Sequence, residues 1–184
     1  MRRVVMSLTV TALLLAVLSL VLMLNQLFKI SLIVATIAMI FDALDGALAR
    51  LWSVESPTGA VADTVTDVFL YLLVPVTWWW ARGIVGWVLF IYFVAGLYRL
   101  LRFTKNGYVT LNNRQYYQGY PVYCCYIIVA SELLSIRPYP LEWLLIIVLS
   151  VLMVSRLPFP KQSLSQYSLG LTVFTLVVML GNYV

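Results

Sequence analysis

The sequence predicts an all-α fold, a polytopic bundle of about six to seven transmembrane helices. Hydrophobic residues make up 63% of the 184 residues and charged residues only 10%, which is too little polar surface to cover a soluble domain. The apolar runs are also long. Residues 4–24 are almost unbroken, and a helix of about 20 apolar residues spans a bilayer. One bundle accounts for the whole length, so we expect residues 1–184 to form a single integral membrane domain.

Breaks in the apolar pattern divide the chain into seven expected helices. Turn-forming or polar residues mark these breaks, among them Asn25-Gln26, Arg82-Gly83 and Arg137-Pro138. The sixth helix is short and lies between prolines, so we expect it to be tilted or partly interfacial. In chain order the expected helices are Val4–Leu24, Phe28–Arg50, Pro57–Ala81, Ile84–Phe103, Gly119–Ile136, Leu141–Ser155 and Leu164–Val184.

The basic residues predict the orientation of these helices. With a cytoplasmic N-terminus, nine of the 12 lysines and arginines lie on the cytoplasmic side, which satisfies the positive-inside rule. The nine are Arg2, Arg3, Arg50, Arg99, Arg102, Lys105, Arg114, Arg156 and Lys161. The net charge of +5 therefore reflects membrane topology and attraction to anionic membrane lipids. Nucleic acid is not an expected partner, because the basic residues flank helices and form no single soluble patch.

The aspartates are concentrated at the expected cytoplasmic ends of the second and third helices. Asp42 and Asp45 are spaced i,i+3, and Asp63 and Asp67 are spaced i,i+4, so each pair lies on one face of its helix. A carboxylate inside a bilayer costs about 2.5–3.5 kcal/mol. Because the two helices are antiparallel neighbours, we expect the two aspartate faces to meet around bound cations.

The available ligands indicate which cations these are. The chain has no histidine, which excludes zinc ligated by histidine. Oxygen ligands alone suit Mg²⁺, Mn²⁺ or Ca²⁺, and four carboxylates can bridge two such ions. A two-metal site is the usual apparatus for exchanging one oxygen for another at phosphorus. Two alternatives remain open: aspartates paired with arginines to fix helix packing, and a cation or proton pathway.

Small and polar residues next to the aspartates favour a ligand cavity. Gly46 directly follows a proposed ligand and leaves the backbone open to a substrate. Ser56 precedes Pro57, which suits the first position of a helix, so the serine could cap the third helix. It could equally donate a hydrogen bond to a phosphate.

The stretch from Asp42 to Asp67 reads D-x-x-D-G-x-x-A-R, eight residues, then G-x-x-x-D-x-x-x-D. It resembles the motif of the CDP-alcohol phosphatidyltransferase family at every fixed position. The resemblance implies a homodimeric, multi-pass enzyme of the cell membrane, with two divalent cations, Mg²⁺ or Mn²⁺, at a cytoplasmic active site. It implies that Asp42, Asp45 and Asp63 bind metal and that Asp67 is both a metal ligand and the catalytic base.

The same resemblance implies that Gly46, Arg50 and Ser56 contact the CDP-lipid, and that CMP leaves when an alcohol attacks the lipid-side phosphorus. Three further stretches resemble phosphatidylserine synthases: "LYRLLRF" at residues 97–103, "YYQGYPV" at residues 116–122 and "MVSRLPFPK" at residues 153–161. The expected acceptor is therefore L-serine, and the expected lipid is CDP-diacylglycerol or an archaeal CDP-lipid. Arg99 and Arg102 are spaced i,i+3 and could bind a phosphate or the serine carboxylate.

Other functions remain open from the sequence. A phosphorylated acceptor, such as glycerol phosphate or inositol phosphate, would need a larger basic cluster, which Arg99, Arg102, Lys105 and Arg114 could supply. Remoter alternatives are an intramembrane prenyltransferase and a divalent-cation transporter. The chain also departs from the family pattern after the last aspartate, where Leu70-Tyr71-Leu72 replaces the usual Ser-Phe-Gly run.

Overall fold

The structure is a computed structural model that describes residues 1–54, 56–111, 114–134, 139–161 and 164–181. It is mostly helical, and four of its helices are long and apolar enough to cross a membrane: Arg2–Leu24, Phe28–Leu51, Pro57–Ala81 and Gly86–Asn106. Three shorter apolar helical stretches follow: Val122–Leu133, Leu141–Val154 and Gln166–Leu180. The protein is an integral membrane protein with several spans. The chain divides into two compact units, Met1–Thr77 and Trp78–Val184.

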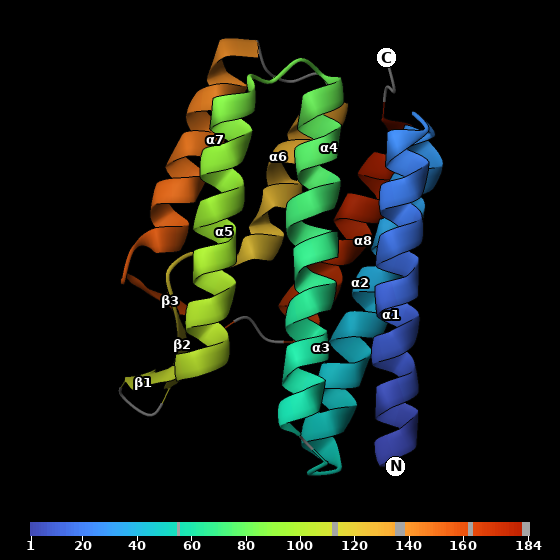
Figure 1. The fold of residues 1–184 in the computed structure, drawn as a ribbon, viewed down its shortest axis with the longest axis vertical. Helices are drawn as coiled ribbons and strands as arrows, with labels where there is room; N and C mark the ends of the chain where they lie inside the picture. The colour runs from blue at the N-terminus through green and yellow to red at the C-terminus, as the bar shows by residue number, and fades with distance from the viewer. Residues whose placement is uncertain (55, 112–113, 135–138, 162–163, 182–184) are drawn as a thin grey trace. The chain divides into compact units, whose positions relative to one another are not determined.

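The first unit begins with a tightly packed pair of helices. Helix α1 (Arg2–Leu24) lies along α2 (Phe28–Leu51), and the two are joined by a short turn at Asn25–Leu27 (Figure 1). Small residues line the contact and let the two backbones approach closely: Ala12, Ala16, Ala35 and Ala38 are fully buried. The buried hydroxyls of Ser19 and Ser31 each donate to the other residue's carbonyl, at 3.0 and 2.7 Å.

The third membrane helix has three parts. It begins as α3 (Pro57–Asp67), widens into a π-helical segment, η1 (Val68–Leu73), and continues as α4 (Val74–Ala81). Helix α3 and segment η1 both contact α1, so the first unit is a bundle built from the first three spans. The π-helical segment has a physical cause in Pro75. Proline has no backbone N–H, so in a regular α-helix Pro75 could not bond the carbonyl of Tyr71, and its ring would clash with that carbonyl.

The second unit contains α5 (Gly86–Asn106), η2 (Val122–Cys124), α6 (Cys125–Leu133), α7 (Tyr139–Val154) and α8 (Leu164–Leu180). Helices α5 and α7 pack against each other (Figure 1). The fifth predicted helix is wrong in its start, because Gly119 has φ +82° and Pro121 follows, so helical structure begins only at Val122. Its predicted end, Ile136, lies outside the described residues.

A small antiparallel sheet also belongs to the second unit and was not predicted by the all-α assignment. Its strands are β1 (Val109–Leu111), β2 (Arg114–Gln118) and β3 (Pro158–Pro160), with β2 in the centre. Tyr117 lies opposite Phe159 in the register. The prolines of β3 fit an edge strand, where a missing N–H disturbs no ladder.

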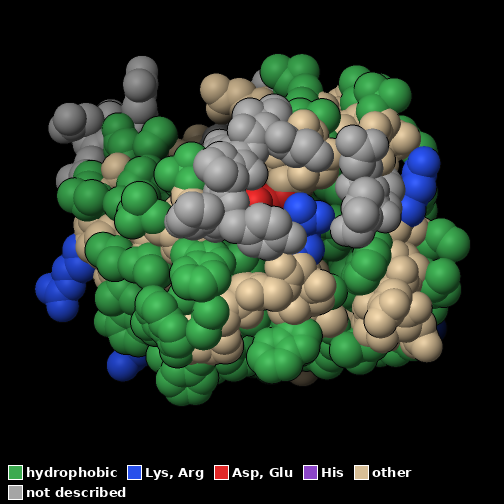
Figure 2. Space-filling model, turned by 90° about the horizontal axis from the view of Figure 1, so that it is seen from above, with side chains coloured by type: hydrophobic (Ala, Val, Ile, Leu, Met, Phe, Trp, Pro, Cys, Tyr) green, Lys and Arg blue, Asp and Glu red, His purple; other side chains and the backbone are tan. Residues whose placement is uncertain are grey.

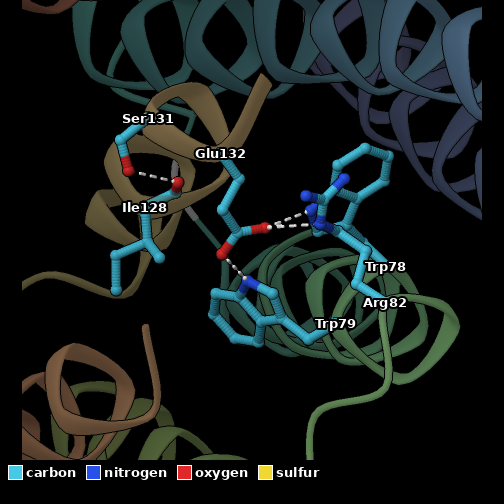
Figure 3. A network of polar contacts seen from close by, with 6 residues as sticks. All are labelled: Trp78, Trp79, Arg82, Ile128, Ser131 and Glu132. Carbon is cyan, nitrogen blue, oxygen red and sulfur yellow. Dashed lines mark hydrogen bonds and ion pairs between the residues drawn. The ribbon is translucent and has the colours of Figure 1, made fainter. Parts of the chain in front are cut away.

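A buried polar network holds α4 and α6 together in the second unit. Glu132 is 2% exposed, and its two carboxylate oxygens accept hydrogen bonds from the indole N–H groups of Trp78 and Trp79, at 2.6 and 2.8 Å (Figure 3). Arg82 adds an ion pair, with Nε 3.8 Å from Glu132 Oε2. Two indole donors and one ion pair therefore compensate the buried carboxylate. Hydrophobic side chains are numerous among the described residues visible in Figure 2.

Candidate functional site

Three aspartates come together in the first unit. Asp42 and Asp45 come from α2 and Asp63 from α3, and one carboxylate oxygen of each lies within 4.8 Å of the others. The i,i+3 spacing on α2 places its two aspartates on one side of the helix, and α3 brings the third to them. Asp67 is not a member of this close group. It ends α3 one turn beyond Asp63 and lies near enough to Asp42 for their charges to interact.

The geometry fits a divalent cation. Asp45 is 3% exposed, and its Oδ2 is buried with no hydrogen-bond partner among the described residues. Leaving a buried carboxylate oxygen unsatisfied is costly, so a cation at this position would supply the missing partner. The three ligand atoms are all oxygens, the set that Mg²⁺ and Mn²⁺ prefer. Asp42, Asp45 and Asp63 are therefore the residues that would hold the metal.

A cavity of about 480 Å³ opens beside the aspartates. Its volume lies within the usual range for small-molecule sites. The cavity lies within the first unit, and its walls come from α1, α2, the turn after α2 and the start of α3. Its lining includes Asp45, Gly46, Arg50, Ser56, Gly59 and Asp63. Acidic, basic and hydroxyl groups thus face one space, as a nucleotide bound through metal would need.

The cavity includes each residue that the resemblance assigned to the CDP-lipid. On α2, an added Cβ at Gly46 would lie 3.4 Å from Arg50 Nη1, so the guanidinium extends over the glycine. Because Gly46 has no side chain, the cavity extends to the backbone of α2 at this position. Ser56 is the N-cap of α3, and its Oγ accepts a hydrogen bond from the N–H of Gly59 at 3.1 Å. The predicted cap is therefore present, and the serine hydroxyl also faces the cavity.

Sequence reasoning gave no role to two residues near the aspartates. Thr9 of α1 lines the cavity and is 6% exposed, although α1 is a mainly apolar span. The hydroxyl of a threonine in a mainly apolar helix was the sequence signal that could have indicated this residue. Tyr71 of η1 is 3% exposed, and its hydroxyl donates to Asp42 Oδ2 at 3.4 Å. No sequence pattern predicts that contact, because it depends on the π-helical segment.

Arg99 and Arg102 both belong to the second unit, where they have different surroundings. Arg99 is 4% exposed, and its guanidinium carbon lies 5.3 Å from the ring centre of Phe103 and 5.2 Å from that of Tyr117. Tyr108 completes this aromatic group, 5.1 Å from Tyr117 between ring centres. Burial raises the pKa of the Tyr117 hydroxyl above its ordinary value, so the ring stays neutral beside the cation.

The guanidinium of Arg102 donates to four backbone carbonyls. Nη1 bonds Val154 at 2.9 Å, and Nη2 bonds Gln118 at 2.6 Å, Met153 at 3.0 Å and Ser155 at 2.9 Å. These bonds join α5 to the end of β2 and satisfy the last carbonyls of α7. Gly119 next to them must be a glycine, because its φ is +82° and an added Cβ would lie 2.9 Å from the backbone carbonyl oxygen of Ser155 and still closer to that of Met153.

Comparison with known proteins gives one result on the family. A protein-family model described as CDP-alcohol phosphatidyltransferase matches residues 4–180. This match covers both units and nearly the whole chain. No curated protein matches the chain significantly.

Proposed function

The chain belongs to the CDP-alcohol phosphatidyltransferase family, and from this premise we propose that it transfers a phosphatidyl group from a CDP-lipid to L-serine, releasing CMP. Phosphatidyl transfer from a CDP-alcohol is the activity of the family. The finer proposal concerns the acceptor and the lipid, which is CDP-diacylglycerol or an archaeal CDP-lipid. The family match leaves the prenyltransferase and the cation transporter without support.

The observation that carries the proposal is the cavity in which Asp45, Asp63, Arg50 and Ser56 face one space. We assign metal binding to Asp42, Asp45, Asp63 and Asp67, with two divalent cations, Mg²⁺ or Mn²⁺, as the expected occupants. Bound cations would grip the diphosphate and stabilise the charge that develops on its oxygens. Gly46 allows close approach of the nucleotide, while Arg50 and Ser56 bind its phosphates.

Asp67 is the proposed base. It lies one turn from Asp63 on the same helix and outside the close group of three, which suits a residue that also handles a proton. Its carboxylate accepts the hydroxyl proton of the acceptor as the acceptor oxygen bonds to the lipid-side phosphorus. The bond from that phosphorus to the oxygen of CMP breaks, and CMP leaves as the anion.

The surroundings of the basic residues favour an acceptor without a phosphate. A phosphorylated acceptor would need several available cations, but Arg102 is already bonded to four carbonyls. The guanidinium of Arg99 is buried against two aromatic rings, and a guanidinium pairs with a carboxylate through two bonds. We therefore assign Arg99 to the serine carboxylate and give Arg102 the role of holding the chain around it. The side chain of Arg114 lies outside the described residues.

An acceptor panel tests this proposal. The purified protein is assayed with Mn²⁺, CDP-diacylglycerol and either L-serine, glycerol phosphate, inositol phosphate or myo-inositol, and CMP release is measured. We expect rapid release with L-serine and little with the others. Release with another alcohol but not with serine would refute the acceptor. Absence of release with every alcohol, from protein shown to bind Mn²⁺, would count against the proposed activity. We also propose a homodimer with its active site on the cytoplasmic side, which cross-linking and cysteine accessibility can test.

A further inference from the structure

We propose that Tyr71 is a positioning residue for the metal site, placed there by the π-helical segment η1, and that it acts through its hydrogen bond to Asp42. This inference rests on the metal site proposed above. It concerns a residue that neither the sequence motif nor the family match assigns.

The first step is the shape of the backbone after Asp67. Residues Val68–Leu73 form a π-helix, and the N–H of Val74 bonds the carbonyl of Phe69, five residues earlier. Each residue of an α-helix turns by about 100°, so a widened turn changes which side chains face the neighbouring helix. Pro75 gives the widened turn a cause, as described above. Segment η1 contacts both α1 and α2, and its residues Leu70, Tyr71 and Leu72 are buried.

The second step is the contact that this backbone produces. The Tyr71 hydroxyl lies 3.4 Å from Asp42 Oδ2, and the residue is 3% exposed. The phenol can donate to a carboxylate at this distance, although the bond is long. Hydrogen bonds in catalytic sites are often long before ligands bind and tighten in the complex. Because water has little access to this tyrosine, the bond acts in a medium of low dielectric constant, where it is stronger.

The third step is the consequence for a metal ligand. A carboxylate can rotate, and a ligand that rotates freely loses entropy when a cation binds. A donor on one oxygen fixes the plane of the Asp42 carboxylate and thereby orients its other oxygen. Loss of such an outer contact typically costs about 10–100-fold in metal affinity or activity. The ring of Tyr71 also fills space between helices, so a test must separate the hydroxyl from the ring.

Tyr71→Phe removes the hydroxyl alone, and Thr36→Val is its matched control. Thr36 is a buried residue of α2, the helix that carries Asp42, but its hydroxyl donates to its own helix at Leu32, 2.7 Å away. Mn²⁺ binding to detergent-solubilised protein is measured by calorimetry without nucleotide, giving affinity and stoichiometry separately. We expect Tyr71→Phe to weaken binding by about tenfold or more at unchanged stoichiometry, and Thr36→Val to bind as the wild type does.

A kinetic measurement gives a second readout. In Tyr71→Phe, the Mn²⁺ concentration for half-maximal CMP release should rise by a similar factor. The rate at saturating Mn²⁺ should stay within about twofold of wild type, because excess cation compensates for a poorly oriented ligand. Wild-type affinity in Tyr71→Phe would overturn the inference. So would an equal loss in Thr36→Val, or a loss of stoichiometry without loss of affinity. If the wild type itself binds no Mn²⁺, the proposed metal site fails first and the inference falls with it.

Discussion

Gly46→Ala should weaken substrate binding without lowering the stability of the fold. Gly46 lies inside α2, next to Asp45, and lines the cavity together with Arg50. An added Cβ would lie 3.4 Å from Arg50 Nη1, which is ordinary van der Waals contact, so the helix has room for a methyl group. Within a helix, alanine is favoured over glycine by about 1 kcal/mol. The variant should therefore fold at least as well as the wild type.

Binding should change in the opposite direction. The methyl group would occupy the floor of the cavity, where the resemblance places the CDP-lipid. Forcing one extra carbon into a close contact costs about 1–3 kcal/mol, which corresponds to about 5–150-fold in affinity. We expect the KM for CDP-diacylglycerol to rise within that range, while the KM for serine changes little. The reason is that the proposed contact of Gly46 is with the nucleotide of the CDP-lipid.

The assay combines CMP release at varied CDP-lipid with thermal unfolding in detergent. Gly170→Ala is the matched control, because Gly170 is an exposed helical glycine of α8 with no atom within 4 Å of an added Cβ. Both variants should raise Tm by about 2–4 °C for a gain of about 1 kcal/mol. Only Gly46→Ala should alter the KM. An unchanged KM would refute contact with the substrate, and a Tm well below that of Gly170→Ala would refute the room inferred for the methyl group.

Three further substitutions test the remaining assignments. Asp67→Asn should lower CMP release by about 10²–10⁴-fold with most Mn²⁺ binding retained, because an amide cannot accept the acceptor's proton; undiminished turnover would contradict the role of base. Arg99→Lys should raise the KM for serine by about tenfold and leave the KM for CDP-lipid unchanged, since a compact ammonium cannot pair with a carboxylate through two bonds. The control is Lys105→Gln, which removes an exposed charge from the same end of α5. An equal rise of the KM for serine in both variants would count against a specific contact. Glu132→Gln should destabilise the protein by about 1–3 kcal/mol, because an amide nitrogen cannot accept from the second indole N–H; unfolding monitored by tryptophan fluorescence measures this, and an unchanged Tm would show that the network contributes nothing.

Much of the site could be predicted from spacing alone. The i,i+3 and i,i+4 pairs indicated which faces of two helices would meet, and Asp42, Asp45 and Asp63 do lie together. Ser56 was predicted as a cap because a proline follows it, and the structure has that cap. These features depend on local geometry, and helical periodicity determines local geometry.

Other features depend on contacts between distant segments, so periodicity could not predict them. The bonds of Arg102 reach carbonyls at residues 118 and 153–155, far along the chain from α5, and the role at the acceptor that its spacing indicated stays a prediction. The strands are only three to five residues long, which is too short for an alternating pattern to be recognised. Strands β1 and β2 lie in a tyrosine-rich run after α5, and β3 lies between α7 and α8. The chain divides into two compact units, and the single domain expected from the sequence stays a prediction.

The arrangement of the first unit explains how a membrane helix bundle can retain costly carboxylates. Asp45 Oδ2 is buried without a hydrogen-bond partner among the described residues, and such a group favours any rearrangement that would expose it to water. The contact between α1 and α2 opposes that rearrangement, because its four buried alanines and the paired serines hold the two backbones close together. The capped start of α3 then fixes Asp63 against them. The packing of the small and apolar residues therefore keeps the Asp45 carboxylate buried. Because the buried carboxylate oxygen has no hydrogen-bond partner among the described residues, binding of a cation is favoured.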